Sequence, residues 1–290
     1  MNTSKTATEK IRRDEKKYND FIGELARRVA ADRSLHLLTV AGPSCSGKTT
    51  TTAKLLSELS RRGRASYMLS IDDFYKKAED MPKKPDGKPD YEALESFDLD
   101  LLHGCLKSLA EGKPTDVPHF DFQKGRRSDV LCRVTPPESG LVVMEGLHAL
   151  NPVVYRNFVP ENAVFGVFLD CHTDTPSEMH YSRFMRRLVR DYHSRRADAE
   201  LTFYLWSGVL DGEKKYIYPF ADLAKARINT RFDYESGVLR DGVTAVLGGL
   251  PADSRYRAFA DTMLAYLATV QPLDASLVPA DSLLREFIGE

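Results

Sequence analysis

The sequence predicts an α/β fold with a parallel sheet, and three observations point to it. The apolar segment 35–40 is followed by a glycine-containing turn and then by the helical pattern of residues 50–59. Two further apolar segments, 65–71 and 141–146, carry acidic residues at or directly after their ends, and another covers residues 164–169. Strands that alternate with helices form parallel sheets, in which the carboxyl ends of the strands meet at one edge. We therefore expect the polar residues that follow these strands to share one site.

The turn after the first strand, residues 42–49, fits the phosphate-binding pattern G-x-x-x-x-G-K-[ST] at every required position. Lys48 adds a charge that reaches the β and γ phosphates of a nucleotide, and the Thr49 hydroxyl is a Mg²⁺ ligand in this pattern. Cys45 is either an oxidation-sensitive thiol or, as we favour, a small filler. The residues expected to bind the nucleotide are Gly42, Pro43, Ser44, Cys45, Ser46, Gly47, Lys48, Thr49 and Thr50.

Composition narrows the classes of partner. The chain has 290 residues, which suits one large domain with extensions, and its net charge is −1 with a pI of about 6.7. This charge provides no broad surface for nucleic acid or an anionic membrane, so we expect neither as a partner. A homo-oligomer is left open. The four cysteines lack metal-type spacing, and no segment resembles a signal peptide or a membrane span, which favours a cytoplasmic protein.

A long insertion follows the second strand. Residues 76–136 contain a lysine- and proline-rich loop, a predicted helix over 99–110 and a predicted β-hairpin formed by 117–122 and 130–134. Insertions of this length are usually functional. Because the insertion starts where the strand ends converge, we expect it to form the acceptor side of the site.

The two ends of the chain show helical patterns. Residues 1–33 predict an amphipathic arm that packs on the domain or on a second subunit. Residues 221–229 predict a short last strand. The segment 250–290 reads as a C-terminal helical extension with an amphipathic helix over 256–267, and we assign it no chemical role.

Arginines concentrate in residues 176–200, which predict a helix. Between His180 and Arg196 the chain has six arginines and one aspartate, a formal charge of six minus one, or +5. The arginines lie opposite the apolar side of the helix. They form either an ordinary solvated face or a lid that holds phosphates. With a phosphate-binding loop in the same fold, we favour the lid.

Phosphoryl transfer needs a phosphate cradle, a carboxylate near Mg²⁺, a group that deprotonates the acceptor hydroxyl, and cations. The strand ends offer Lys48, the pair Asp72 and Asp73, and Glu145. Strand alternation directs only one of the two aspartates to the site, and we favour a turn or cap role for Asp73. The candidate catalytic residues are Lys48, Asp72, Arg187 and Arg190, and the candidate Mg²⁺ ligands are Thr49, Asp72 and Glu145.

From about Leu35 to Asn229 the sequence resembles the uridine kinase and phosphoribulokinase family of P-loop kinases, most closely its uridine kinase branch. Besides the loop, the shared motifs are Asp72-Asp73-Phe74-Tyr75 (Asp-Ser-Phe-Tyr in the family), Pro118-His119-Phe120-Asp121-Phe122 (Pro-x-Tyr-Asp-Phe), Glu145-Gly146-Leu147-His148-Ala149 (Glu-Gly-Ile-x-Ala) and Arg186-Arg187-Leu188-Val189-Arg190-Asp191 (Arg-Arg-x-x-Arg-Asp). The resemblance implies a three-layer P-loop fold with sheet order 2-3-1-4-5 and makes residues 34–290 a kinase domain. It also implies ATP- and Mg²⁺-dependent phosphorylation of a small molecule's hydroxyl group, with Asp72 as the general base.

The same resemblance implies the acceptor site. Its substrate-binding residues would be Tyr75, Tyr91, Glu92, Phe120, Arg187 and Arg195. Three positions depart from the uridine kinase pattern: Glu92 replaces the pocket aspartate, Gly125 a pocket histidine, and Ala197 a later lid arginine. Residues 283–289 are also similar to the tail of bacterial uridine-kinase-like proteins that carry a tRNA-synthetase-like domain.

The departures leave several functions open. A nucleoside such as uridine or cytidine is the leading acceptor, and a sugar, a sugar phosphate or another metabolite is the alternative. A nucleotide-dependent switch or RNA-associated ATPase is a rival of a different class, which the neutral overall charge disfavours. A binding module without catalysis is disfavoured by the intact Lys48, Thr49, Asp72 and Glu145. The sequence does not decide between ATP and GTP.

Overall fold

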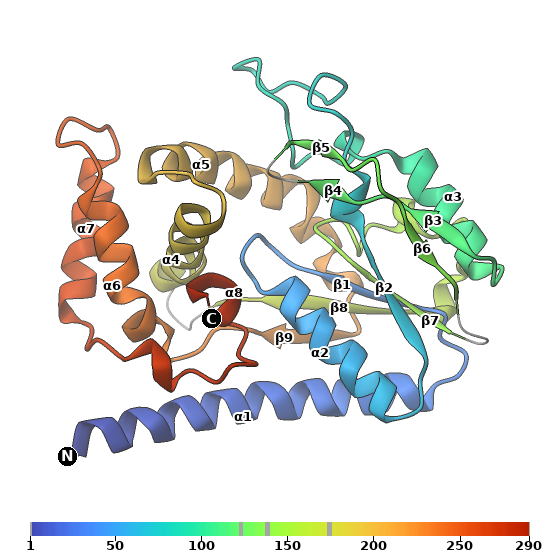
Figure 1. Cartoon of the computed structure of the whole chain (residues 1–290), viewed down its shortest axis with the longest axis horizontal. Coiled ribbons are helices and arrows are strands. Elements are labelled where there is room, and N and C mark those ends of the chain that lie inside the picture. The colour runs from blue at the N-terminus through green and yellow to red at the C-terminus, as the bar shows by residue number, and fades with distance from the viewer. Residues whose placement is uncertain (1, 122–123, 137–139, 173–175, 290) are drawn as a thin grey trace.

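The computed structural model describes residues 2–121, 124–136, 140–172 and 176–289, without the side chains of residues 2–5 and 176–180. A five-stranded parallel sheet of order β2-β7-β1-β8-β9 lies at its centre (Figure 1). The strands are β1 (Leu37–Ala41), β2 (Ser66–Ser70), β7 (Leu141–Glu145), β8 (Val164–Asp170) and β9 (Ala226–Asn229). Counted among these five alone, the order is 2-3-1-4-5, which confirms the predicted fold class.

Helices cover both faces of the sheet. On one face α1 (Asn2–Ala31) packs along α2 (Lys48–Arg61), and both bury apolar side chains such as Ile22 and Leu55 in one core with β1, β7 and β8. On the other face α3 (Leu99–Ala110) covers the sheet together with residues 147–163. The arm therefore packs on the domain of its own chain, as Figure 1 shows for the long helix below the sheet.

The insertion contains two short antiparallel pairs. The strands β3 (Thr115–Val117) and β6 (Cys132–Val134) form one pair, and β4 (Phe120–Asp121) and β5 (Arg126–Arg127) form the other. The predicted hairpin is present, but its hydrogen bonding is interrupted between the two strand pairs. Arg126 and Arg127, which were expected in the turn, form strand β5. Phe122 and Gln123 lie outside the described residues. Gly125, in the turn, has φ = 63°.

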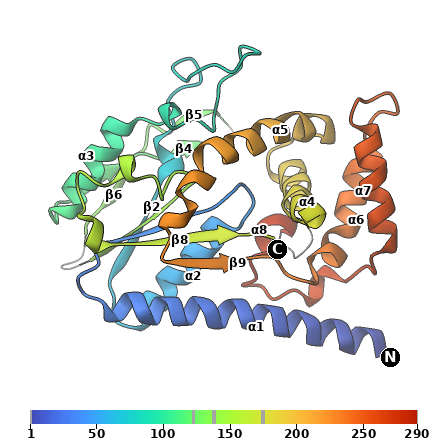
Figure 2. The same ribbon diagram turned by 180° about the vertical axis from the view of Figure 1, so that it is seen from behind.

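Four helices form a second core beside the sheet. They are α4 (Pro176–Ser194), α5 (Ala199–Tyr216), α6 (Glu235–Gly248) and α7 (Arg257–Thr269), and they enclose Phe184, Trp206, Val243 and Met263. The sequence pattern predicted no element over residues 235–248, which form α6. The helix contains three glycines, which are poor helix formers, and Tyr234 gives it no side-chain cap. Figure 2 shows these helices from behind.

The last described residues return to the phosphate-binding loop. The short helix α8 (Arg285–Ile288) lies beside α4, and Leu283, Leu284 and Phe287 are fully buried.

Short 3-10 helices lie at Ile71–Phe74, Leu94–Ser96, Pro152–Val154, Glu161–Ala163, Tyr218–Leu223 and Ala275–Leu277. The last strand is therefore shorter than predicted, because residues 221–223 belong to a 3-10 helix. Among the described residues, every helix is too short or too polar to cross a membrane.

Candidate active site

The phosphate-binding loop joins β1 to α2. Gly47 directly precedes α2 with φ = 79°, and Cys45 is also in the left-handed region, with φ = 62°. A Cβ atom on Gly42 would lie 2.6 Å from the carbonyl oxygen of Leu169, so this position also requires glycine. Gly47 has no side chain that could cap α2. The first amide groups of the helix therefore remain available to an anion.

Lys48 is the first residue of α2, and its side chain turns back over the loop. Its Nζ donates hydrogen bonds to the carbonyl oxygens of Gly42, at 3.1 Å, and Pro43, at 3.2 Å. The ammonium group therefore lies across the loop itself, where the phosphates of a nucleotide bind in this motif.

Asp72 and Glu145 follow neighbouring strands and lie close together. Ser70 and Glu145 are paired in register across β2 and β7, and the Ser70 hydroxyl donates to Glu145 Oε1 at 2.6 Å. Burial, with the nearby charge of Asp72, raises the pKa of Glu145 to about 7. Burial also raises the pKa of Asp72, against the opposing charge of Lys48. Within the described residues, the buried Asp72 Oδ1 has no hydrogen-bond partner.

Asp73 has a different environment from its neighbour. Its Oδ1 accepts hydrogen bonds from the backbone amide of Phe120, at 3.0 Å, and lies 2.9 Å from His119 Nδ1. Asp73 thus ties the insertion to the end of β2. Asp72 and Asp73 have different surroundings, but not for the predicted reason. Both lie in the 3-10 helix Ile71–Phe74 and not on a strand. Strand alternation therefore does not set their directions.

The two carboxylates and the loop fit a magnesium ion. No group of three or more His, Cys, Asp or Glu side chains suited to a metal occurs among the described residues. Mg²⁺ needs fewer protein ligands, since it keeps several waters and binds phosphate oxygens together with one or two carboxylates. Asp72 has an unpaired buried oxygen, and Glu145 ionises with difficulty beside it. A divalent cation near Thr49 would offset both charges.

The arginines of α4 are buried, so the solvated-face alternative is wrong for most of them. Arg183, Arg186 and Arg187 are exposed by only 1%, 0% and 7%. Arg183 forms a bidentate ion pair with Glu213 of α5, at 2.7 and 3.0 Å. Glu213 also accepts a hydrogen bond from the backbone amide of Ser44 in the loop, at 2.9 Å. This pair therefore holds α4, α5 and the loop together.

Arg186 has a second structural role. It pairs with Glu235 at 2.5 Å and donates to the backbone carbonyl oxygens of Cys45, at 3.1 Å, and Thr230, at 2.7 Å. Its charge is thus neutralised within the protein. Neither Glu213 nor Glu235 was predicted, because no local motif marks these partners.

Arg187, Arg190 and Arg195 share a single carboxylate. Arg187 Nε lies 3.1 Å, Arg190 Nη2 2.7 Å and Arg195 Nε 3.7 Å from an oxygen of Asp191. Arg187 also donates to the Ser44 hydroxyl of the loop, at 3.1 Å. Three cations on one carboxylate leave excess positive charge beside the loop. The structure thus brings together the predicted arginines next to the phosphate site, while their catalytic role stays a prediction.

An aromatic cluster follows Asp72 on the insertion side. The Tyr75 ring stacks on Phe97 with centroids 4.2 Å apart, and the rings of Phe120 and Tyr91 lie 5.4 and 5.8 Å from it. The Tyr75 hydroxyl donates to the Tyr91 carbonyl oxygen at 2.8 Å, and Tyr75 and Phe120 are buried whereas Tyr91 is 40% exposed. The structure therefore brings together the three predicted aromatic residues.

Glu92 stands next to this cluster. Burial raises its pKa to about 7, opposed by the charge of Arg187 and enhanced by that of Glu213. Its Oε2 is buried and has no hydrogen-bond partner in the described part of the chain. A buried carboxylate oxygen without a partner is suited to accept a hydrogen bond from a hydroxyl group.

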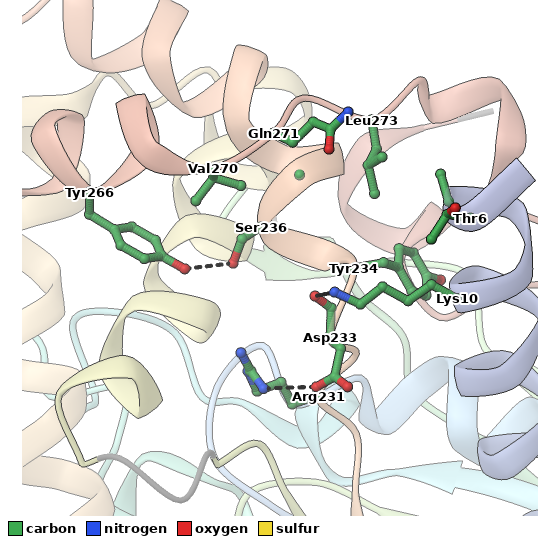
Figure 3. Close-up of a pocket in the computed structure, with 12 residues that line it drawn as sticks. Thr6, Lys10, Arg231, Asp233, Tyr234, Ser236, Tyr266, Val270, Gln271 and Leu273 are labelled. Atoms are coloured by element: carbon green, nitrogen blue, oxygen red, sulfur yellow. Dashed lines mark hydrogen bonds and ion pairs between the residues drawn. The ribbon is translucent and has the colours of Figure 1, made fainter. Parts of the chain in front are cut away.

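A separate cavity of about 500 Å³ lies away from this site (Figure 3). Its lining comes from α1, from residues 231–237 before and at the start of α6, from Tyr266 of α7 and from residues 270–273 after it, and includes no residue of the loop. Lys10 donates to the Asp233 carbonyl oxygen at 2.8 Å, and Tyr266 donates to Ser236 at 3.2 Å. Several polar groups of the cavity thus bond to one another, and we assign it no chemistry.

A G-x-x-x-x-G-K-T loop after the central strand of a five-stranded parallel sheet defines a P-loop kinase fold. The model of the phosphoribulokinase / uridine kinase family matches residues 37–233, and the chain belongs to this family.

Individual proteins agree with this assignment. The chain is 33% identical over 159 residues to a protein named uridine kinase from Deinococcus deserti, covering 55% of this chain and 70% of that protein. It is 30% identical over 171 residues to one of the same name from Staphylococcus aureus (strain JH9), covering 58% and 75%. A solved structure of a "possible uridine kinase" from Bacillus stearothermophilus has a TM-score of 0.50 at 20% identity, covering 72% of this chain and 98% of that one. The last likeness supports the fold alone.

Proposed function

We propose that this protein is an ATP- and Mg²⁺-dependent kinase that transfers the γ-phosphoryl group to a hydroxyl group of a small molecule, with a nucleoside as the leading acceptor. The observation that carries the proposal is the position of Asp72. Its carboxylate has a buried oxygen without a hydrogen-bond partner among the described residues, and it interacts electrostatically with Lys48 of the loop and with Tyr75 of the aromatic cluster. A base between a phosphate site and an acceptor wall is the arrangement that phosphoryl transfer requires.

In the proposed reaction, the acceptor oxygen forms a bond to the γ-phosphorus while the bond from phosphorus to the β,γ-bridging oxygen breaks. The hydroxyl proton passes to Asp72, and ADP leaves with the electron pair of the broken bond. Asp72 must be ionised to accept the proton. Burial raises the pKa of Asp72, and the charges of Lys48, Arg195 and Arg190 oppose this rise and favour the ionised form.

The cations supply the remaining stabilisation. Arg187 and Arg190 lie beside the loop with Asp191 as their shared counterion, so they have donors for the charge that develops on the transferring group. Thr49, Asp72 and Glu145 would hold Mg²⁺, which would offset the negative charge of the phosphates.

The acceptor side supports a molecule that has both a ring and hydroxyl groups. Tyr75, Tyr91 and Phe120 would form an aromatic wall for the ring. Glu92 would accept a hydrogen bond from a hydroxyl group. The names of the relatives favour a nucleoside. A sugar or sugar phosphate is the alternative, because the residues that read a pyrimidine in the family are changed here.

The side chains next to Gly125 do not replace the histidine that the family has at this position. Lys124 pairs with Asp121 at 2.8 Å and is 67% exposed, and Arg126 is directed to Asp129 at 3.9 Å. We therefore propose that uridine and cytidine are phosphorylated weakly compared with a typical uridine kinase, since a site that lacks a hydrogen bond to its substrate discriminates poorly.

An assay of ADP release tests this function. The purified protein is given MgATP with a panel of nucleosides, sugars and sugar phosphates, and the rate without acceptor is the control. We expect one of these classes to raise the rate well above the control. ADP release that no acceptor stimulates contradicts the proposal, and stimulation by RNA instead would favour the RNA-associated ATPase.

A further inference from the structure

The C-terminal tail, residues 281–288, lies against the start of α2. Leu283 is fully buried, and a Cβ atom on Gly47 would lie 2.2 Å from its Cδ1. The last glycine of the phosphate-binding loop is thus covered by a side chain from the other end of the chain. Figure 1 shows α8 beside the loop and α4, well apart from the β4–β5 pair of the insertion.

Two buried contacts hold the tail in place, and one exposed ion pair lies beside them. The Ser282 hydroxyl donates to the buried carboxylate of Glu15 in α1. Lys54 of α2 pairs with Asp281 at 2.8 Å. The guanidinium group of Arg186, which also bonds the loop, lies 5.3 Å from the ring centroid of Phe287. The tail is therefore held firmly and forms one wall of the loop.

This wall places a carboxylate beside the phosphate site. The hydroxyl of Thr50, the third residue of α2, donates to Glu286 Oε2 at 2.8 Å. Within the described residues, Glu286 Oε1 has no hydrogen bond or ion pair. Glu286 is only partly exposed. It therefore presents one acceptor oxygen next to the helix end that binds the phosphates.

A fixed acid beside a triphosphate is unfavourable unless its charge is offset, because like charges repel, and the charge of Arg190 offsets that of Glu286 in part. A ribose joined to the α-phosphate carries hydroxyl groups, and a carboxylate oxygen accepts hydrogen bonds from hydroxyls strongly. Lys48 and Asp72 define the end of the loop where the γ-phosphate reacts. The tail contacts α2 through Thr50 and Lys54 and packs on α4, apart from the β4–β5 pair of the insertion, so we place it on the side of the nucleoside part of the donor.

We propose that Glu286 is a specificity residue of the donor site, which accepts a hydrogen bond from a ribose hydroxyl of the nucleoside triphosphate. This inference rests on the proposed function, because it needs a nucleotide at the loop. It gives the C-terminal tail a role in choosing the donor.

The test is a binding experiment without acceptor. Titration calorimetry measures the affinity of the full chain, with Mg²⁺, for ATP, 2′-deoxy-ATP, 3′-deoxy-ATP and inorganic tripolyphosphate. We expect wild type to bind ATP roughly tenfold more tightly than at least one deoxy analogue, the usual size for a hydrogen bond to a charged group. In Glu286→Gln the ATP affinity falls by about that factor and the discrimination disappears, while tripolyphosphate binds equally well or better.

Two further variants separate contact from structure. Glu286→Asp keeps the charge but shortens the side chain, so it should lose the discrimination and bind tripolyphosphate like wild type. Asp281→Asn removes an exposed carboxylate of the same tail and should leave all four affinities unchanged. Thermal unfolding of each variant verifies that the fold is intact.

The outcomes distinguish this inference from the proposed function. Equal binding of ATP and both deoxy analogues by wild type overturns the ribose contact. So does a Glu286→Gln variant that binds ATP and tripolyphosphate more tightly by the same factor, since the carboxylate then only repels phosphate. Asp281→Asn with the same loss as Glu286→Gln would show displacement of the tail instead. Tight ATP binding without transfer to any acceptor contradicts the proposed function alone, whereas a wild type that binds no nucleotide overturns both.

Discussion

Asp72 and Asp73 are neighbours in sequence with different partners, so their amide variants form a matched pair. Asp72→Asn keeps the shape of the side chain but removes the proposed base. We expect ATP still to bind while transfer slows by roughly 10²- to 10⁴-fold, the usual size of a general-base contribution. Asp73→Asn weakens the hydrogen bonds to His119 and Phe120 and should reduce transfer less. Single-turnover kinetics measure both, and a greater loss in Asp73→Asn would reverse the assignment.

Glu92 makes stability depend on pH. Burial raises its pKa from 4.5 to about 7, so the folded state favours the protonated form. This contribution is complete below pH 4.5 and is lost as the pH rises through 7. Glu92→Gln cannot ionise, so it should be more stable than wild type at pH 8, by no more than about 3 kcal/mol, and nearly equal to it at pH 5. Urea unfolding at both pH values measures the difference, and an equal gap at the two values would show that Glu92 titrates normally.

Gly125 tests the choice of acceptor. Its φ of 63° is in the left-handed region, where histidine and asparagine are tolerated, and a Cβ atom there would meet nothing within 4 Å. Gly125→His should therefore fold and raise kcat/KM for uridine, while Gly125→Asn controls for the change of backbone. Efficient and selective uridine phosphorylation by wild type would show that the missing imidazole is not needed.

At the scale of elements, α4 separates two kinds of arginine. Arg183→Met should lower the free energy of unfolding by about 3–5 kcal/mol, because Glu213 is left buried without its partner. Arg190→Ala should leave stability nearly unchanged but lower kcat/KM, since Asp191 keeps Arg187 and Arg195 as partners. Chemical unfolding and steady-state kinetics on both variants separate the two roles. Unchanged kinetics in Arg190→Ala would assign that side chain a structural role only.

How far each element was predictable depends on how local its signal is. The strand, loop and helix around Lys48 follow from one continuous motif, and the sheet order follows from the family that this motif indicates. Burial of Arg183 and Arg186 did not follow, because their partners lie 30 and 49 residues away, without a pattern that links them. The contact of Glu286 was not predicted for the same reason, because it lies 236 residues from Thr50. The location of the candidate residues near the loop was therefore predictable, and the residues that hold them were not.

For the whole molecule, the tail links stability to the loop. Leu283→Ala removes a fully buried side chain from above Gly47 and should lower the free energy of unfolding by about 2–5 kcal/mol. Leu223→Ala, at a side chain that is 46% exposed, is the control and should change stability by less than about 0.5 kcal/mol. Urea unfolding measures both, and a loss of similar size in the two variants would show that the tail does not support the loop.

The contact between Thr50 and Glu286 also has a consequence for biosynthesis. Domains fold from the N-terminus as the chain leaves the ribosome, and β1, the loop and α2 emerge long before the residue that completes their wall, 236 positions later. Contacts between such distant segments form slowly. A nascent chain can therefore display the whole phosphate-binding motif while the covering of Gly47 is still missing, so the proposed choice of nucleotide would be acquired only after Glu286 has been synthesised.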